Sequence, residues 1–563
     1  MAAERKKLTW QECLLHALLL IVPLVFVFPK TFTAGEMIAP GDILYEIPPW
    51  KAHTPPELEE KLLENSDRLI LDAITAMDTY YMLTERALDN GEWPLWNHLE
   101  LAGMPLMANC QSAVFYPPRL VHRFFEFWTA TTLYILMKLW LCGMTMYLCL
   151  RLLLLGRPAA RLASFAWMLA SYNLIWSYWP LPDVSAWAPV LFLGVELILR
   201  ERYQRGFFAL AFGASLVLLA GHPESAFVFS LGLGFYFFLR LVFERRWGGL
   251  LMKPIVAAGG AWVVALLVYS VTLIPFLEYL ANSWTVLDRV DRPVDQKAYL
   301  YGSTAAAFWV PRFLGTWVEQ NFWGKWNSNL TGMVYPGVTM WLAASLLLVK
   351  GSWSKRAKMR AIALTISGVI FGMFAFYVPP LQFIHDFPPF NTMYECYHVA
   401  WTVFVIMLLG AFGLDRWFAR ERAPKETLWM LVPTGLAVLV VGFIYAFQAA
   451  FFSRVGHLSY VHVQILIAVA VLLASAGIIV ASCYFRKPAI TGAALVIVMS
   501  ADLVLALRGI NSTSPPEQLF IQTEITDFLL AQEQPCRAGV AMGLIPGGIM
   551  PIYGVEQWTG YDG

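Results

Sequence analysis

Charged side chains are scarce in this sequence, and the charges that are present almost cancel. Only 14% of the 563 residues are charged, 58% are hydrophobic, and the formal net charge is +1. A water-soluble globule cannot hide that much apolar surface in one core. A near-neutral chain also lacks the concentrated basic face that nucleic acid binding requires. The composition therefore predicts a membrane protein and excludes nucleic acid as a partner.

Motifs for metal and nucleotide binding are missing as well. The seven cysteines form no CxxC pair and no Cys/His spacing, so the sequence predicts no metal site. Neither GxxxxGK[ST] nor a GxGxxG that follows a strand occurs. Internal repeats and paired interrupted helices, the usual signs of a transporter, are not found. A divalent cation stays open as a cofactor, and no other cofactor is predicted.

Long apolar runs, in contrast, are abundant. Counting windows near the ~20 residues that a bilayer requires, we predict about thirteen membrane-spanning helices. They lie near residues 11–29, 129–150, 159–178, 184–200, 206–221, 224–240, 254–280, 333–350, 359–377, 396–414, 427–447, 460–484 and 489–507. Residues 29–31 make a poor signal-peptide cleavage site, so the first run is kept as a helix. The predicted fold class is an all-α polytopic membrane protein.

The basic residues predict how the chain is oriented. More than half of the 40 lysines and arginines fall in alternate connections, at residues 5–7, 151–161, 200–205, 240–253, 350–360, 416–425 and 486–487. The positive-inside rule places these connections in the cytoplasm. We therefore expect a cytoplasmic N-terminus and, with an odd number of spans, an extracytoplasmic C-terminus.

The remaining connections are long and are predicted to face outside. We divide the chain into an N-terminal helix at 1–29, a first extracytoplasmic loop at 30–128 that is the candidate active-site loop, a helical bundle at 129–507 and an extracytoplasmic tail at 508–563. Further external loops are expected near 281–332 and 378–395. Because ATP and nucleotide sugars are scarce outside the cytoplasm, a donor used there must have crossed the membrane already activated.

The stretch from Gly91 to Pro118 stands out within the first loop. It contains four prolines, several glycine or asparagine turn signals and a row of aromatics, so it predicts an ordered loop without helical or strand period. Its tryptophans and tyrosines are expected near the lipid headgroups. Loops of this kind usually carry function.

Six short motifs occur in an order that resembles a known family. They are Gly41-Asp42 just after the first helix, PLWN at 94–97, GMPLMANCQSAVFYPP at 103–118, AWAP at 186–189, AGHPESAF at 220–227 and FPPFN at 387–391. This order resembles the bacterial YfhO-like membrane proteins, which belong to the GT-C group of lipid-linked-sugar glycosyltransferases. The final PIYGVEQWTGYDG looks like the start of an extracytoplasmic domain in that family, whose members continue further, so we expect a truncated form.

The resemblance implies an enzyme. It implies transfer of a sugar from a polyprenyl-phosphate-linked donor to an envelope polymer, lipid or glycan acceptor, at the extracytoplasmic face of a bacterial inner membrane. Membrane lipid is then a further partner. Four residues within the motifs, Trp96, Asn97, Asn109 and Gln111, are candidate substrate-binding residues.

Such a transferase needs a base and a site for negative charge. The acceptor hydroxyl must lose its proton to a positioned carboxylate or imidazole. Asp42 is the first candidate base, because the resemblance places an acidic catalytic residue in the first external loop. Asp72, flanked by Asp67 and Asp78, is the second. The alternative for both is a solvated acidic loop or helix caps.

Three further residues are candidates for contacts with a lipid phosphate. His222 and Glu224 lie in a short link between two spans, where His222 could bind the phosphate and Glu224 could fix its tautomer. The alternative is ordinary helix chemistry, in which Pro223 begins the next helix and Glu224 improves its N-terminal dipole. Lys138 falls inside the second span, where an ammonium is costly unless it is paired or reaches water.

Aromatic external segments give weaker signals. Arg312, near Trp317, could face a phosphate or a sugar ring, although the surrounding aromatics more often anchor helices. Family members commonly have an arginine soon after the FPPFN loop, whereas this chain has Glu395 and His398. No phosphate-binding role is transferred to that position.

Two other functions stay open. A transporter or flippase for a lipid-linked saccharide would also be polytopic, with ionisable groups near its spans. A non-catalytic envelope-assembly protein could keep the fold with an inert site. For the transferase, we predict that His222 and at least one of the two candidate aspartates line one outward-facing cavity.

Overall fold

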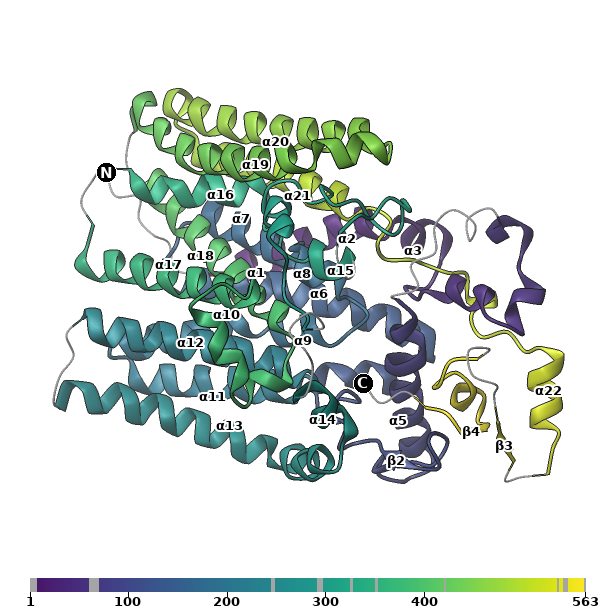
Figure 1. Ribbon diagram of the computed structural model, residues 1–563. Helices are drawn as coiled ribbons and strands as arrows, with labels where there is room; N and C mark the ends of the chain where they lie inside the picture. The colour runs from purple at the N-terminus through teal and green to yellow at the C-terminus, as the bar shows by residue number, and fades with distance from the viewer. Residues whose placement is uncertain are drawn as a thin grey trace.

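The computed structural model describes residues 8–59, 70–244, 249–290, 297–324, 328–349, 353–419, 422–533, 536–539 and 545–560. Long helices lie side by side in a bundle, and a smaller body of loops and short helices covers one end of it (Figure 1). The chain begins at the opposite end of the bundle (Figure 1). The fold is therefore divided into a membrane part and an external part.

Ten helical segments in the described part of the chain are long and apolar enough to cross a membrane. They are Trp10–Val27, Phe127–Leu152, Leu181–Leu199, Pro223–Phe243, Leu251–Ala281, Lys355–Ala375, Glu395–Phe418, Pro424–Arg454, Leu458–Phe485 and Pro488–Ala506. Two shorter apolar helices, Tyr203–Leu219 and Val338–Leu348, fall where full spans were predicted. The protein is thus an all-α polytopic membrane protein, as the sequence predicts, with fewer full-length spans than the thirteen expected.

The predicted span at 159–178 is broken in the structure. It consists of α7 (Arg157–Met168) and α8 (Ser171–Ile175), with Ala170 in an extended conformation between them. The Asn173 side chain donates a hydrogen bond of 2.5 Å to the Trp167 carbonyl. Because an asparagine side chain competes here for a carbonyl that the next helical turn would use, the helix ends at this point.

The helices of the bundle fall into two halves along the chain. The first half consists of α1 (Trp10–Leu19), α2 (Ile21–Val27), α6 (Phe127–Leu152), α7, α8, α9 (Leu181–Ser185), α10 (Ala188–Leu199), α11 (Tyr203–Leu219), α12 (Pro223–Phe243) and α13 (Gly249–Ala281). The second half consists of α16 (Val338–Ser345), η8 (Leu346–Leu348), α17 (Lys355–Ala375), η11 (Glu395–His398), α18 (Val399–Phe418), η12 (Pro424–Met430), α19 (Leu431–Arg454), α20 (Leu458–Phe485) and α21 (Pro488–Ala506). Short external elements between them are α3 (Pro29–Ala34), α14 (Trp284–Val290), η7 (Gly302–Phe308), α15 (Ser328–Gly332), η9 (Leu381–Asp386) and η10 (Phe390–Thr392).

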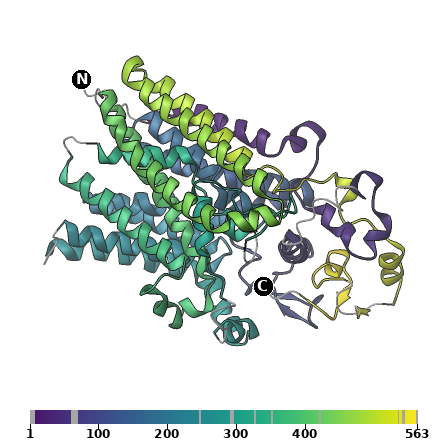
Figure 2. The same ribbon diagram turned by 45° about the horizontal axis from the view of Figure 1, so that its top comes forward.

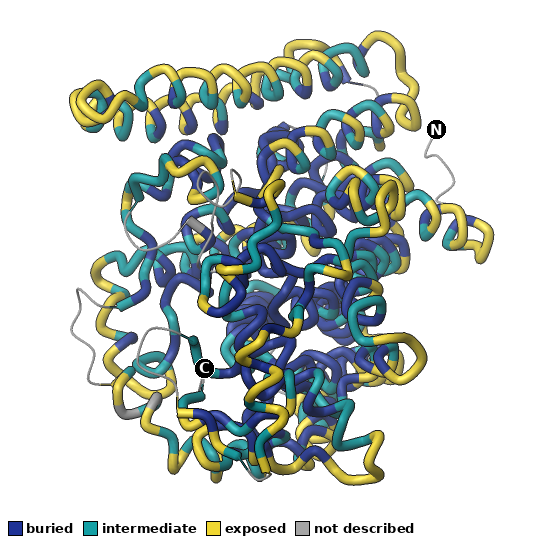
Figure 3. Tube along the Cα trace, turned by 90° about the vertical axis from the view of Figure 1, so that its right-hand side faces the viewer, coloured by how far each residue is buried: buried dark blue, intermediate teal, exposed yellow. Residues whose placement is uncertain are grey.

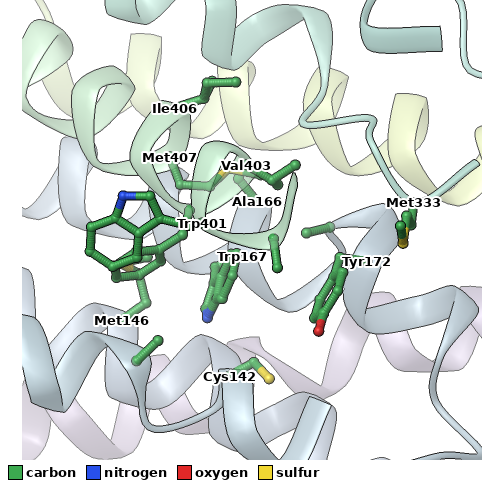
Figure 4. Packing of buried hydrophobic residues seen from close by; sticks show 14 of the residues in the cluster. Cys142, Met146, Ala166, Trp167, Tyr172, Met333, Trp401, Val403, Ile406 and Met407 are labelled. Atoms are coloured by element: carbon green, nitrogen blue, oxygen red, sulfur yellow. The ribbon is translucent and has the colours of Figure 1, made fainter. Parts of the chain in front are cut away.

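The core of the bundle lies where α7 and α18 meet. Trp167 and Trp401 are almost fully buried there and both pack against Phe404, at ring-centroid distances of 5.0 and 5.6 Å (Figure 4). Buried chain occupies the centre of the molecule and exposed chain its periphery (Figure 3). The outer helices α13, α19 and α20 expose many apolar side chains, as expected for helices that face lipid.

The external body is built from two segments that are far apart in sequence. The first loop contributes η1 (Gly41–Glu46), η2 (Trp50–His53), η4 (Ala73–Asp78), α5 (Thr79–Asp89), β1 (Trp96–Asn97), β2 (Met104–Pro105) and η5 (Pro117–Arg123). The C-terminal tail contributes η13 (Pro516–Gln518), α22 (Glu524–Leu530), β3 (Arg537–Ala538), η14 (Met550–Tyr553) and β4 (Glu556–Gln557). The two segments intermingle beyond the ends of the helices (Figure 2).

A separate small core joins the loop and the tail. Buried Leu44 and Trp50 of the loop pack in one cluster with Ile549 and Met550 of the tail. The Trp50 indole N–H lies 3.1 Å from the Ile521 carbonyl and 3.0 Å from the Tyr553 hydroxyl. The loop predicted at 30–128 and the tail predicted at 508–563 therefore form one body.

Cysteine labelling in intact cells tests the predicted orientation. Single cysteines replacing the exposed Asn90 and Gln320 are expected to react with a membrane-impermeant maleimide, because the positive-inside rule predicts that both lie on the external side. Cysteines at the exposed Gln204 and Lys358 are expected to react only after the membrane is opened. The parent chain, whose seven cysteines are buried or half-buried, gives the background. Reversed labelling would refute the orientation.

Candidate functional site

The loop at 91–118 folds as a short hairpin followed by turns. Strands β1 and β2 pair antiparallel, with Asn97 opposite Met104. The buried Asn97 amide donates to Glu100 Oε2 at 2.6 Å, and its oxygen accepts from the Leu99 amide at 2.9 Å. Trp96 is 58% exposed and lies against Gly103, where a side chain would collide with the indole. Asn97 thus shapes the hairpin, whereas Trp96 stays open to contacts.

The same loop leads into a group of buried polar residues at the outer end of the bundle. We name this group the junction cluster, because it joins the external body to the membrane helices. Its members are Asp78, Tyr81, Arg119, His122, Tyr134, Lys138 and Asp183. They come from η4, α5, η5, α6 and α9.

Lys138 is the member that lies deepest in the membrane part. Its Nζ lies 3.2 Å from Asp183 Oδ2 and donates to the Trp179 carbonyl at 3.0 Å. The ammonium also lies 4.7 Å from the centre of the Tyr134 ring. Both charged side chains are at most 1% exposed. Burying such an ion pair away from water costs free energy. Replacing one partner alone destabilises the fold more than replacing both, because it leaves a buried charge without a partner.

Arg119 brings a second cation from η5. Its guanidinium carbon lies 3.6 Å from the centre of the Tyr81 ring, and its Nη2 lies 3.6 Å from a Glu85 oxygen. The residue is only 4% exposed, yet Nε and Nη2 make no hydrogen bond within the described part of the chain. Buried donors normally find a partner. The Nε–H of Arg119 is therefore available to an anion, whereas Nη2 already lies beside Glu85.

His122 is neutral in this environment. Burial, together with the charge of Arg119, lowers the pKa of its imidazole to about 2. The ring lies 3.2 Å from the Arg119 carbonyl through Nδ1 and 3.3 Å from the Thr131 hydroxyl through Nε2. A neutral ring satisfies both contacts by donating from Nδ1 and accepting at Nε2. His122 holds η5 against α6 without adding charge.

Asp78 is the acidic member contributed by the external body. It is the last residue of the π-helical turn η4 and is 6% exposed. Burial raises the pKa of its carboxyl to about 7, and the charges of Arg119 and Lys138 act in the opposite direction. A carboxyl with such a pKa exchanges protons near neutral pH, as general acid or base catalysis requires. Single π-helical turns also occur frequently at functional sites.

His222 and Glu224 lie beside the junction cluster. His222 is the N-cap of α12, and its Nδ1 accepts a hydrogen bond of 3.1 Å from the Ser225 amide. Burial lowers the pKa of the imidazole to about 3, so the neutral ring carries its proton on Nε2. Glu224 instead contacts Arg289 and the Tyr394 amide. The Ser225 amide, rather than Glu224 as expected, therefore fixes the His222 tautomer.

Aromatic rings connect the His222 turn with Lys138. Trp179, whose carbonyl accepts from Lys138, packs edge-on against Trp176 at 5.1 Å. Trp176 lies 6.0 Å from Tyr397, and Tyr397 lies 5.4 Å from His222. The loop at 103–118 contacts α9 as well, because the Tyr116 hydroxyl donates to the Asp183 carbonyl at 3.3 Å. The sequence motifs at 103–118 and 220–227 thus meet at one place.

The space at this junction is small in the structure. A cavity of about 10 Å³ lies between Cys110, Gly221 and Tyr269, room for one water at most. Cys110 has a left-handed φ of 65°, and its carbonyl lies 3.1 Å from the position of a Gly221 Cβ.

The two aspartates selected from the sequence lie in the external body. Asp42 is 9% exposed in η1, next to the tail residues Ser514 and Leu519 that contact Gly41. Asp72 is half-buried and immediately precedes the π-helical turn that ends at Asp78. The prediction that His222 shares a cavity with one of them stays a prediction.

Two of the other candidate residues, Asn109 and Arg312, have structural partners. Asn109 is 8% exposed, and its side-chain oxygen accepts from the Ser112 amide at 3.2 Å, while Gln111 beside it is half-buried. The Arg312 guanidinium bonds Glu319 at 2.7 Å, the Ala506 carbonyl at 2.9 Å and the Arg508 carbonyl. Arg312 therefore ties an external segment to the outer end of α21.

Two solved structures are similar to this chain. One is ArnT from Cupriavidus metallidurans bound to undecaprenyl phosphate, 13% identical, covering 87% of this chain and 83% of that chain with a TM-score of 0.46. The other is the same ArnT in the apo state, 14% identical, covering 85% and 79% with a TM-score of 0.45. No family model and no curated protein matches the sequence. The roles proposed below rest on the side chains of this chain.

Sequence reasoning selected Lys138 and missed the other members of the junction cluster, among them Arg119, Asp183 and Asp78. Arg119 directly follows the Pro117-Pro118 pair, and Asp183 lies in the link at 179–183 that was taken only as a connection. Asp78 was noted only as a neighbour of Asp72. The buried lysine was the available signal, because an intramembrane ammonium calls for an acidic partner on a neighbouring segment.

Proposed function

We propose that this protein is a membrane glycosyltransferase of the GT-C type. It transfers a sugar from a polyprenyl-phosphate-linked donor to an envelope glycan, lipid or polymer acceptor at the outer face of a bacterial inner membrane. The observation that carries the proposal is the junction cluster, which sets two cations and a carboxyl with a pKa of about 7 at the outer end of the bundle. The order of the sequence motifs, which resembles the YfhO-like proteins, supports it.

The cations fit the leaving group of this reaction. As the bond between the anomeric carbon and the phosphate oxygen breaks, its electron pair stays on the phosphate, and negative charge accumulates there. Arg119 offers its Nε–H, which makes no hydrogen bond in the described part of the chain, and Lys138 adds a charge nearby. Arg119 lies just before the span Phe127–Leu152 and Lys138 lies within it, so that the polyprenyl tail can remain in the membrane.

Asp78 is suited to the role of the general base. The acceptor hydroxyl gives its proton to the Asp78 carboxylate while its oxygen forms the new bond to the anomeric carbon. The neutral Nε2–H of His222 is a donor for a phosphate or sugar oxygen. Asp42 and Asp72, the candidates from the sequence, are alternatives for the base in the same external body.

The pH dependence of the rate follows from the pKa of Asp78. Below pH 7 the carboxyl is protonated, so the transfer rate is expected to fall about tenfold per pH unit and to level off above pH 7. Loss of stability does not explain such a fall, because a carboxyl with a raised pKa stabilises the fold at low pH and loses that contribution as the pH rises through 7. Single-turnover rates between pH 5 and 8.5 in proteoliposomes measure the profile. A rate that is constant from pH 5 to 7 would contradict the assignment.

Reconstitution tests the function itself. Purified protein in liposomes receives a polyprenyl-phosphate-linked sugar and an envelope acceptor fraction, and transfer is followed with labelled sugar. The Arg119→Gln variant is expected to lose most of the rate, whereas Arg123→Gln, a surface arginine that pairs with Glu85 and Asp89, serves as matched control. If wild-type protein moves labelled lipid across the bilayer without forming product, the flippase is supported. If neither occurs, the assembly role is supported.

A further inference from the structure

The π-helical turn that ends at Asp78 is held from outside by the C-terminal tail. Gly548 has a left-handed φ of 88°, and a Cβ on it would lie 1.8 Å from the Thr75 carbonyl oxygen. The tail backbone therefore touches the middle of the turn η4. No side chain other than hydrogen fits at this contact without moving backbone.

Thr79 makes the second contact between the turn and the tail. Its hydroxyl lies 2.6 Å from the Gly548 carbonyl and 3.1 Å from the Ile74 carbonyl, five residues earlier. The residue is fully buried and directly follows Asp78. Because the hydroxyl contacts a carbonyl of the π-helical turn and a carbonyl of the tail at once, it couples the two.

Further contacts fix the tail beyond this point. Arg86, two turns along α5, donates to the Pro551 carbonyl at 2.9 Å and to the Ile552 carbonyl. Gln557, which is fully buried, donates from its amide to the Leu99 carbonyl at 2.7 Å. Its side chain donates to the Pro546 carbonyl at 3.1 Å, which links the two sides of Gly548 within the tail. The tail is thus anchored to α5 and to the hairpin by residues that follow Gly548.

A π-helical turn is rare because regular α-helical bonding competes with it. If η4 relaxed to an α-helix, the residues before and after it would rotate relative to each other, and Asp78 would leave its place beside Arg119 and Lys138. We propose that the tail at 545–560 positions Asp78, with Gly548 and Thr79 as the positioning residues. This inference rests on the proposed function only for its kinetic readout.

The test compares Gly548→Ala with Gly554→Ala. Both glycines have φ above 80°, but a Cβ on Gly554 meets nothing within 4 Å. The two variants share the backbone strain, and only Gly548→Ala collides with η4. We expect Gly548→Ala to lower the transfer rate constant about 100-fold, as displacements near 1 Å do, and to shift the midpoint of the pH profile. Gly554→Ala should keep both.

Thr79 provides a second, milder pair. Thr79→Val keeps the shape and removes the hydroxyl, and is expected to shift the pH midpoint and lower the rate; Thr79→Ser keeps the hydroxyl and should restore both. If Gly548→Ala does not accumulate in the membrane, the two Thr79 variants still test whether the tail positions Asp78. Wild-type rates and midpoints in both Gly548→Ala and Thr79→Val would overturn the proposal.

Hydrogen exchange separates this proposal from the function. Amides at 73–84 are expected to exchange faster in Gly548→Ala and Thr79→Val than in Gly554→Ala and Thr79→Ser. If wild-type protein does not transfer sugar but this exchange pattern is seen, the proposed function is refuted, whereas the positioning of η4 by the tail is supported. Equal exchange in all four variants would refute the positioning of η4 by the tail, whatever the transfer activity.

Discussion

Replacing Asp78 with asparagine is expected to lower the rate of sugar transfer by roughly 10²- to 10⁴-fold, the usual contribution of a general base. Asparagine keeps the size of the side chain and removes its ability to take a proton. Because the buried carboxyl is protonated at least half the time at neutral pH, its replacement by a neutral amide should leave the fold and the membrane abundance nearly unchanged. Single-turnover transfer in proteoliposomes, normalised to inserted protein, measures the effect.

Asp42→Asn and Asp72→Asn are the matched comparisons. Both positions lie in the same external body, and neither substitution changes side-chain size. Full activity in Asp78→Asn together with a large loss in Asp42→Asn or Asp72→Asn would move the base to that residue. Full activity in all three variants would favour the flippase or the assembly role.

Removing Lys138 alone is expected to destabilise the protein by about 3–5 kcal/mol, since Asp183 is then left buried without its partner. In the double variant Lys138→Met/Asp183→Asn the unpaired charge is gone, and most of the lost stability should return. Thermal unfolding in detergent, followed by intrinsic fluorescence, compares Lys138→Met and the double variant with the wild-type protein.

The same double variant separates two roles of the lysine. If Lys138 stabilises the departing phosphate, transfer stays at least tenfold below wild type after stability has been restored. Recovery of wild-type transfer in the double variant would show that the pair serves the fold alone, and Arg119 would then remain as the phosphate ligand.

The parts of the fold that follow from local hydropathy could be predicted from the sequence. Runs such as 129–150 and 460–484 became the helices α6 and α20, because a long apolar run has few other stable states in a membrane. The break near Ala170 could not be predicted, since the run through it is apolar enough on average for a span and the break depends on one contact of the Asn173 side chain.

The candidate site could be predicted only in part. The motif at 103–118 ends directly before Arg119, and the buried lysine called for an acidic partner. The identity of that partner depends on how α6 and α9 pack, which no local pattern encodes. Asp78 was missed for a similar reason. Its burial depends on contacts with η5 and with the tail, which lie far from it in the sequence. The acidic residues near it in the sequence are instead typical of a solvated segment.

The joint construction of the external body from the first loop and the tail sets the order of events during synthesis. Trp50 and Tyr553, which contact each other, are 503 residues apart. At roughly 5–20 residues per second, the ribosome needs about half a minute or more to add that length. Throughout that time Leu44 and Trp50 have no partners from the tail. The nascent protein therefore exposes an apolar surface until residues 545–560 have been made, and the turn that ends at Asp78 is fixed in place only then.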